Sequence, residues 1–462
     1  MFKNGPFIVR RERIGFKRRC LGLRPVPVVE SGKFCHNTLV VFCVYDMVLP
    51  FFPEVPMKRL VVCLNVLALT FFFTTAFAQE KPKKPAEYTS EADITKDAAL
   101  KRDFDVQGEY LGKFGDWTIG LNLIAEGGGK FGLVVFVGGL PGDGWQQGDI
   151  RAFGKFAFNE NGELEYRLEQ LDDGGGRRTI TADDTDALRG TATFTESATT
   201  VEPAKSSTAD RQRPVYRIGG LRNSRLLGAR SRGPVLSKQT DEKITKTDAK
   251  LTIVAAGNTY EFVKQYRESP TLGLKAPQGA VVLFADGQAS EMFEKAELNK
   301  EAQTLWSEAW TKPFEKKPYS MHIEFLLSYM PTARGQARSN SGVYVDETYE
   351  CQVLDSFGLE GENNECGGFY KVSAPKVNMC FPPLRWQTYD IDFVPATFDA
   401  DGKKAASATI SVKHNGKVIQ NAIRPEKETG GRKKETPEAR GLYLQGHGNR
   451  VQFGNIWFKY AD

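Results

Sequence analysis

The chain has 462 residues, enough for about three domains of ordinary size. Hydrophobic residues make up 40% and charged residues 26% of the sequence, with a mean hydropathy of −0.39, which excludes a polytopic membrane protein and a wholly disordered one. The net charge of +5 comes from residues 1–78, which hold 11 Lys and Arg against 4 Asp and Glu and leave the remainder at −2, so we predict no nucleic-acid partner.

Residues 57–78 have the pattern of a secretory signal peptide. The basic Met57-Lys58-Arg59 precedes an apolar stretch at 60–73, and Ala76-Phe77-Ala78 places small residues at the −3 and −1 positions of a cut before Gln79. The alternative is a membrane anchor, because the stretch approaches the ~20 residues that span a bilayer. We favour cleavage, with export to the periplasm or the outside and no stable membrane anchor afterwards. Residues 1–56 are then expected to be an upstream extension, with Met57 as the true start.

The next segments predict a flexible leader and a small β-rich domain. Residues 79–101 are charged and contain Pro82 and Pro85, which indicates the leader. Short strands separated by glycine turns are expected at 117–125, 130–137, 152–158, 164–169 and 250–255, within a domain over 102–270. Residues 195–249 are expected to form a solvated, low-complexity loop, and 271–279 a linker.

One glycine pattern in this domain matches a cofactor fingerprint by letter. Gly127-x-Gly129-x-x-Gly132 has the dinucleotide spacing, but a strand rather than a helix is expected to follow it. We interpret these glycines as a turn and predict no cofactor.

Residues 280–462 predict a second strand-rich domain. Asn415-Gly416 is typical of a tight hairpin turn. So many antiparallel strands and so little helix predict two packed sheets, an all-β jelly-roll sandwich. The expected strands are 280–284, 320–328, 341–345, 349–355, 386–393, 408–414, 417–422, 441–445 and 451–459.

Three cysteines follow the expected cleavage site. In an oxidising compartment Cys366 and Cys380 are the candidate disulfide, whereas Cys351 lies in an apolar strand pattern and is expected to be a buried free thiol. The alternative is a thiolate metal site. We predict no metal, because no CxxC or HxxxH spacing accompanies the cysteines.

Strand alternation groups polar side chains on two of the expected strands. Glu350 and Gln352 share one face of their strand, and Tyr443, Gln445 and His447 share one face of another. These groups can lie across one concave sheet, and the alternative is an ordinary solvent-facing surface. Asn340, Tyr344, Asn378, Trp386 and Tyr389 lie near them in the sequence and are residue types that stack on sugars and hydrogen-bond hydroxyls.

The motifs of 280–462, in their order and spacing, resemble the 3-keto-disaccharide hydrolase domain family. The resemblance implies a concanavalin A-like jelly roll, usually exported, that cleaves glycosides whose sugar has been oxidised to a ketone at carbon 3. Two departures are Ala285, inserted where the family usually has Leu-Phe-Asp-Gly, and Cys351, in place of a commoner apolar residue. The motifs are Leu283-Phe284-Ala285-Asp286-Gly287, Asn340-Ser341-Gly342-Val343-Tyr344, Tyr349-Glu350-x-Gln352-Val353-Leu354-Asp355-Ser356, Cys366-Gly367-Gly368-x-Tyr370, Ala374-Pro375-Lys376-Val377-Asn378, Trp386-Gln387-Thr388-Tyr389-Asp390, Leu444-Gln445-x-His447-Gly448-Asn449 and Phe453-x-Asn455-Ile456-Trp457.

A ketone at carbon 3 suggests a mechanism, because it acidifies the hydrogen on carbon 2. A base removes that proton, the group at carbon 1 leaves, and water adds back. We expect Glu350 or His447 to be the base and Gln352, Lys376 and Asn378 to polarise the ketone or enolate, although Lys376 and Asn378 can equally form a rigid turn. Trp386 and Tyr344 are expected to contact the sugar. Asn340, Asp355 and Gln445 complete the predicted substrate-binding residues.

Two other functions remain open. A conventional retaining glucanase on the same fold carries Glu-x-Asp-x-x-Glu, and the corresponding residues here are Glu350-x-Gln352-x-x-Asp355. Gln352 replaces the central carboxylate, which weakens this comparison. The other alternative is a lectin-like, non-catalytic carbohydrate-binding module.

Overall fold

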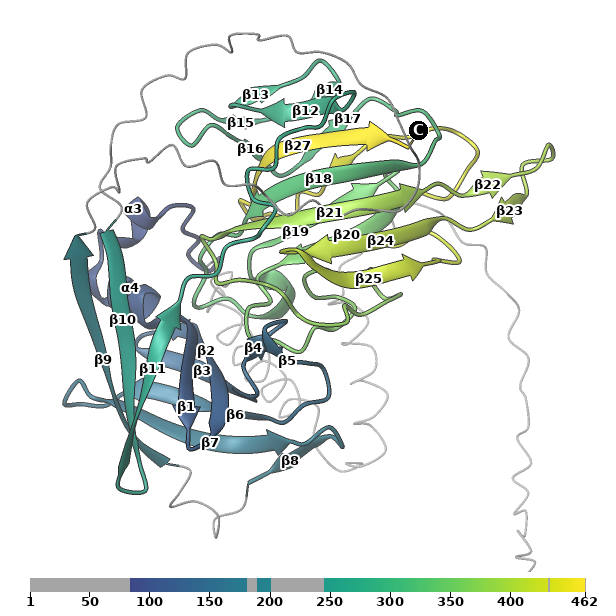
Figure 1. Cartoon of the computed structure of the whole chain (residues 1–462). Helices are drawn as coiled ribbons and strands as arrows, with labels where there is room; N and C mark the ends of the chain where they lie inside the picture. The colour runs from purple at the N-terminus through teal and green to yellow at the C-terminus, as the bar shows by residue number, and fades with distance from the viewer. Residues whose placement is uncertain (1–83, 181–188, 201–244, 431–432, 462) are drawn as a thin grey trace, which may run out of the picture. The chain divides into compact units, whose positions relative to one another are not determined.

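The computed structural model describes residues 84–180, 189–200, 245–430 and 433–461 (Figure 1). The predicted extension (1–56) and signal peptide (57–78) lie outside these ranges. Among the described residues, no helix has the length and apolar character needed to cross a bilayer.

The described part of the predicted leader contains two short helices, which were not expected in a flexible segment. Helix α3 spans Glu91–Ile94 and α4 spans Ala98–Val106. Asp97 caps α4 by accepting hydrogen bonds from the Ala99 and Leu100 amides. Both helices bury an apolar residue, Ile94 and Val106, in the core of the first domain. Capping and apolar burial outweigh the charged composition that suggested a flexible segment.

The first domain is a closed antiparallel barrel. Its strands pair in chain order, and the pairings of β1 with β11 and of β6 with β7 complete the ring. Tyr110, Phe131, Phe156 and Leu251 fill its interior. The β-rich domain is confirmed as all-β. The barrel strands are β1 (Gly108–Phe114), β2 (Trp117–Gly127), β3 (Lys130–Val137), β6 (Arg151–Phe158), β7 (Leu164–Asp172), β9 (Arg189–Thr200), β10 (Thr245–Ala255) and β11 (Asn258–Gln265), with β4 (Leu140–Pro141), β5 (Gly144–Trp145) and β8 (Arg177–Thr179) as short additions.

The predicted loop 195–249 begins and ends inside strands. Strand β9 runs to Thr200 and β10 starts at Thr245, and these two residues face each other as ladder partners. Residues 201–244 lie outside the described ranges. The glycine pattern is a turn, as predicted: Gly127, Gly128 and Gly129 all have positive φ between β2 and β3.

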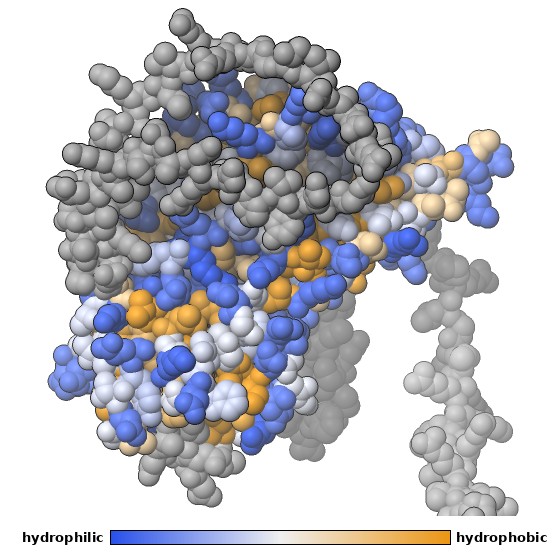
Figure 2. Space-filling model, viewed as in Figure 1, coloured by the Kyte–Doolittle hydropathy of each residue, from blue (hydrophilic) through white to orange (hydrophobic). Residues whose placement is uncertain are grey.

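The surface of the barrel is mixed in character. Figure 2 shows apolar and hydrophilic residues interspersed over its strands. At the β1–β2 turn, Phe114 and Trp117 are exposed, and the Phe114 ring stacks on Tyr260 at 4.5 Å.

The second domain is a sandwich of two antiparallel sheets, which confirms the predicted jelly roll. The larger sheet has the order β13-β12-β27-β18-β21-β24-β25, with β16 joined to β27 and β15 to β16, and the smaller one has the order β14-β17-β26-β19-β20. Asn415 and Gly416 both have positive φ in the β24–β25 turn, as a type I′ hairpin requires. The strands of the larger sheet are β12 (Val281–Ala285), β13 (Gln288–Ala289), β15 (Leu298–Asn299), β16 (Thr304–Trp306), β18 (Tyr319–Leu326), β21 (Trp386–Val394), β24 (Thr409–His414), β25 (Lys417–Ile423) and β27 (Gln452–Tyr460). Those of the smaller sheet are β14 (Phe293–Lys295), β17 (Ala309–Thr311), β19 (Asn340–Val345), β20 (Tyr349–Leu354) and β26 (Tyr443–Leu444), and β22 (Thr397–Phe398) pairs with β23 (Lys404–Ala406).

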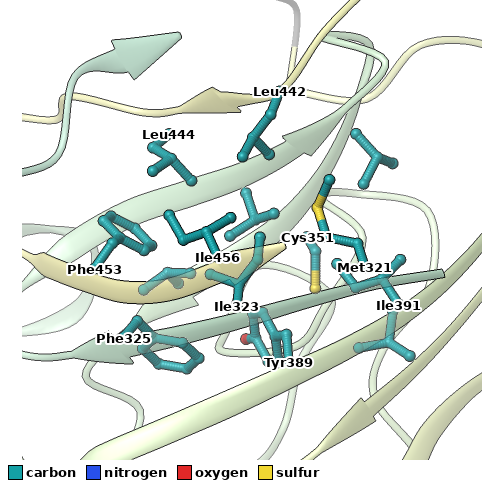
Figure 3. Packing of buried hydrophobic residues seen from close by; sticks show 14 of the residues in the cluster. Met321, Ile323, Phe325, Cys351, Tyr389, Ile391, Leu442, Leu444, Phe453 and Ile456 are labelled. Atoms are coloured by element: carbon teal, nitrogen blue, oxygen red, sulfur yellow. The ribbon is translucent and has the colours of Figure 1, made fainter. Parts of the chain in front are cut away.

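The core lies between the two sheets (Figure 3). Met321, Ile323 and Phe325 enter it from alternate positions of β18, while Cys351 and Leu444 enter it from the smaller sheet. The intervening residues of β18 therefore point away from the core.

The three cysteines of the sandwich are buried free thiols. The prediction is confirmed for Cys351, whereas the expected Cys366–Cys380 disulfide is absent. The Cys366 sulfur lies 3.1 Å from the Tyr389 hydroxyl, and the Cys380 thiol donates to the Leu354 carbonyl. Burial in the core with hydrogen-bond partners accommodates both residues in the reduced form.

The first residues of the predicted linker, 271–274, contact the outer face of the larger sheet. There His322, fully buried, contacts Asp390 at 2.6 Å and Glu324 at 3.2 Å. Thr271 donates to Asp390, and the amide of Gly273 donates to Glu324. The start of the linker thus covers a buried charged cluster.

Candidate functional site

The smaller sheet carries a row of polar and aromatic side chains that crosses all five of its strands. In register, Glu350 of β20 pairs with Tyr344 of β19, which pairs with Tyr443 of β26. Tyr443 pairs with Trp310 of β17, and Trp310 pairs with Lys295 of β14. Directly paired residues in an antiparallel sheet point to the same face, so these five side chains form one row, called here the cross-strand row.

The cross-strand row faces away from the core. The residues that alternate with it, including Val343, Cys351 and Leu444, are fully buried in the sandwich core. The predicted alternation along 349–355 is therefore confirmed, and the two predicted strands belong to one sheet. We therefore place the candidate chemistry on the side chains of this row.

Glu350 is a buried acid at one end of the row. It is 3% exposed, its amide donates to the Thr429 hydroxyl at 2.5 Å, and Tyr344 hydrogen-bonds its carboxylate. Burial raises the pKa of Glu350 from 4.5 to about 7, and the hydrogen bond with Tyr344 opposes only part of this shift. A carboxyl with this pKa exchanges protons near neutral pH.

Gly430 covers Glu350. A Cβ atom at Gly430 would lie 2.1 Å from Glu350 Oε2 and 2.4 Å from the Tyr344 hydroxyl, and the φ of +64° also favours glycine. Gly430 is itself exposed, so the carboxylate lies directly beneath the surface.

Amide side chains surround the same end of the row. Gln445 donates to the Tyr344 hydroxyl at 3.1 Å, and Gln352 donates to Asn340 Oδ1 at 2.9 Å. Within the described residues the buried Gln445 Oε1 has no hydrogen-bond partner. The structure thus brings together five predicted site residues, namely Glu350, Gln352, Asn340, Tyr344 and Gln445. An acceptor without a partner is suited to a ligand hydroxyl.

His447 is not in contact with this group. It is exposed and follows the end of β26. Across the described ranges, no hydrogen bond or ion pair joins it to Glu350 or Gln352. The predicted grouping of these three residues is therefore correct only for Glu350 and Gln352.

Asp355 lies outside the site and makes a structural ion pair. Its side chain is fully buried, accepts from Arg338 Nε at 2.6 Å and accepts from the Phe357 amide. These bonds engage both carboxylate oxygens, so the structure places Asp355 in a buried ion pair and not with the residues grouped at Glu350.

The other three predicted residues also lie away from Glu350. Trp386 belongs to β21 of the larger sheet, and Lys376 is exposed on the loop before it. Asn378 donates to the carbonyls of Ser356 and Leu359. Asn378 therefore holds a turn together, which is the structural alternative stated for it above.

A cleft elsewhere in the described region is lined by residues of the barrel and the sandwich, including Asn378 but not Glu350. Its charged groups are paired: Arg267 with Glu109, and Arg151 with both Asp172 and Glu360. Only the Arg151–Glu360 pair joins the barrel to the sandwich, and the other two pairs lie within the first domain. Because these charges are already paired, we place the candidate site on the smaller sheet.

Sequence reasoning missed Lys295, Trp310 and Gly430. Trp310 lies in a strand of three residues between buried Ala309 and Thr311, too short for a periodic signal. The alternation of Ala309, Trp310 and Thr311 was the only indication in the sequence that Trp310 faces the site.

A comparison with protein families agrees with the motif resemblance. Residues 262–459 match the family model described as a 3-keto-alpha-glucoside-1,2-lyase-like domain. A crystal structure of a "putative glycosyl hydrolase" from Parabacteroides distasonis ATCC 8503 at 2.13 Å resolution is 29% identical, with 40% of this chain and 85% of that chain covered and a TM-score of 0.36. A second, with the same description and organism, at 1.70 Å resolution, is 17% identical, with 40% and 95% covered and a TM-score of 0.28. No protein with curated annotation matches.

Proposed function

We propose that the protein cleaves glycosides whose sugar carries a ketone at carbon 3, because residues 262–459 match the 3-keto-alpha-glucoside-1,2-lyase-like family model. The reaction removes the proton on carbon 2, expels the group at carbon 1 and adds water, so that the net change is hydrolysis. The observation that carries this proposal is the buried Glu350, with its raised pKa, within the cross-strand row.

Glu350 is the proposed base. A general base works best when its pKa lies near the working pH, and the pKa of about 7 meets this condition. The carboxylate oxygen takes the carbon-2 proton, and the electron pair of that C–H bond passes to the ketone oxygen as the enolate. Since Gly430 covers the carboxylate, substrate contact requires the backbone around Gly430 to move away from Glu350.

The amides near Glu350 are proposed to bind the sugar and the enolate. The Nε2 of Gln352 now donates to Asn340 Oδ1, and the Nδ2 of Asn340 donates to Gln336, so both would exchange these partners for the substrate oxygen. Each such donor aimed at a developing oxyanion is worth about 3 kcal/mol. Gln445 Oε1 accepts a sugar hydroxyl, which satisfies an acceptor that is otherwise buried without a partner.

The test compares a glucoside with its 3-keto derivative as substrates of the purified protein. We expect release of the leaving group from the keto form alone. Release from the unoxidised glucoside would instead support a retaining glucanase, and release from neither, with glycan binding retained, would support a lectin-like module.

Two variants distinguish the two candidate bases. Glu350→Gln is expected to lower the rate by roughly a hundred- to ten-thousandfold, the usual worth of a general base. His447→Ala, which removes an exposed side chain outside this cluster, is expected to retain activity. The opposite pattern would assign the base to His447.

The structure disfavours the glucanase alternative at one position. A retaining glucanase needs two carboxyls ~5–5.5 Å apart, one of them free to attack the sugar. Asp355 is committed to Arg338, and Gln352 carries no charge.

We also propose that the protein is exported, on the basis of the 57–78 pattern. Its carbohydrate substrate would then be met in the periplasm or outside the cell.

A further inference from the structure

The residues before helix α3 pack against the sandwich. The backbone of Tyr88 pairs with that of Tyr329, with N···O distances of 3.0 and 2.8 Å, and the carbonyl of Thr89 accepts a hydrogen bond from Gln452 Nε2 at 2.9 Å. Residues 84–90, called here the leader segment, thus run beside the end of β18 and the start of β27.

One carboxylate oxygen of Glu87, in the leader segment, holds two separate parts of the sandwich. Glu87 Oε1 accepts from the Arg450 amide at 2.5 Å and from the Ser328 hydroxyl at 2.8 Å. The Glu87 side chain is 11% exposed, and Lys84 Nζ lies 3.5 Å from its other oxygen, Oε2. Ser328 follows β18 and Arg450 precedes β27, so this carboxylate joins two turns that are far apart in the sequence.

The first route from Glu87 runs through two serines to the start of β19. Ser328 Oγ lies 2.9 Å from Ser339 Oγ, and the Ser328 amide donates to the same Ser339 oxygen at 2.8 Å. A hydroxyl has one hydrogen, so Ser328 donates to the Glu87 carboxylate while Ser339 donates to Ser328. Ser339 is fully buried with a φ of +41°, which is strained for a residue with a side chain. These bonds therefore help to hold the strained turn from which Asn340 enters β19.

The second route runs through the loop before β27. The Arg450 amide that donates to Glu87 directly follows Asn449, which is buried. Asn449 Oδ1 accepts a hydrogen bond from the Asn340 amide at 3.0 Å. Both routes therefore meet at Asn340, whose Oδ1 accepts from Gln352 Nε2 at 2.9 Å.

We propose that Glu87 is a positioning residue that sets the side-chain amides of Asn340 and Gln352 for the reaction. The inference rests on the proposed function, because it takes these two amides to be the donors to the enolate. Glu87 precedes the barrel in the chain, whereas the residues that match the family model are 262–459. The sandwich thus receives part of the support of its site from a segment outside the matched residues.

The kinetic test uses methyl 3-keto glucoside as the substrate. Removal of an oxyanion donor lowers kcat by about a hundred- to a thousandfold, and Glu87→Ala displaces the donors without removing them, so we expect a loss of about tenfold in kcat. KM should be nearly unchanged, because the enolate forms only after the substrate has bound. Glu87→Gln should restore most of the rate, since its amide oxygen can still accept from Arg450 and Ser328.

Glu91→Ala is the matched control, because it removes a carboxylate from an exposed position on α3. Its kcat should equal that of the wild type. An unchanged kcat in Glu87→Ala, or an equal loss in Glu91→Ala, would overturn the proposal.

Hydrogen exchange followed by mass spectrometry provides a second readout that does not depend on turnover. We expect Glu87→Ala to speed exchange about tenfold in peptides that contain Asn340 and Arg450, while exchange in the barrel strand β2 stays as in the wild type. Exchange that matches the wild type in both peptides would overturn the proposal, and so would faster exchange spread equally over both domains, which indicates a general structural role. If the wild-type protein turns over no 3-keto glucoside, the proposed function fails, and the exchange still decides whether Glu87 holds Asn340 in place.

Discussion

Replacing His322 with leucine is expected to destabilise the sandwich in a pH-dependent way. In the folded protein the imidazole is fully buried, with Nδ1 2.6 Å from Asp390 and Nε2 3.2 Å from Glu324. The variant leaves both carboxylates without their central partner. It therefore isolates the contribution of the cluster beneath the linker.

The expected loss in the free energy of unfolding depends on the hydrogen bonds that each carboxylate keeps in the variant. Removing one partner of a buried ion pair typically costs 3–5 kcal/mol. Here Asp390 keeps its bond from Thr271 and is 21% exposed, while Glu324 keeps its bonds from Gly273 and Asn455. We therefore expect the lower end of the range, about 3 kcal/mol, in the free energy of unfolding.

The direction of the pH effect follows from the pKa shifts. Burial lowers the pKa of His322, but the hydrogen bonds to Asp390 and Glu324 outweigh it and raise the pKa above 6.5. The stabilisation is thus complete below pH 6.5 and is lost as the pH rises through the folded pKa. Burial raises the pKa of Glu324, but the hydrogen bonds from His322, Asn455 and Gly273 outweigh this effect and hold the pKa below 4.5. The stabilisation that Glu324 contributes is therefore lost as the pH falls through that lower pKa. The difference between wild type and variant should be largest between pH 4.5 and 6.5.

Urea unfolding followed by tryptophan fluorescence provides the measurement, since Trp457 stacks on His322 with the ring centroids 5.4 Å apart. The difference should be about 3 kcal/mol at about pH 5.5 and clearly smaller at about pH 9. Ser320→Ala is the control, because Ser320 lies on the same face of β18 but is exposed. Equal differences at the two pH values would refute the charged-cluster interpretation, and a difference below about 1 kcal/mol would refute the magnitude.

Three other predictions can be checked directly. Arg338→Met should lower the free energy of unfolding by about 3–5 kcal/mol, measured by urea titration, because it leaves Asp355 buried and unpaired, whereas a joint Arg338→Met/Asp355→Leu exchange should recover much of the loss. Gly430→Ala should reduce turnover of a 3-keto glucoside at least tenfold, with the far-UV circular dichroism unchanged, because the new Cβ would collide with the Glu350 carboxylate. Mass spectrometry of exported protein should find Gln79 as the first residue, and an intact 57–78 segment would contradict the proposed cleavage.

Local patterns predicted the parts of the fold that depend on neighbouring residues. The alternation around Glu350 gave its face of β20 correctly, because side chains on a strand must alternate. Asn415-Gly416 likewise predicted its turn, since both residues tolerate positive φ.

Features that depend on distant partners could not be predicted in this way. The ring closure by β1 and β11 joins segments far apart in the chain. The role of Asp355 depended on Arg338, which reaches it from before β19. Trp310 joined the row only through its pairing with Tyr443, a partner that no local pattern in a three-residue strand identifies.

The facing positions of Thr200 and Thr245 at the ends of β9 and β10 have a consequence for protein engineering. The entropy of closing a flexible insert between two anchored ends grows only logarithmically, about 0.6 kcal/mol for each doubling of its length. Because the ladder of β9 and β10 holds these two ends together, an insert placed between them should leave the ring shut. A tag or a foreign module can therefore be grafted at this junction at little thermodynamic cost.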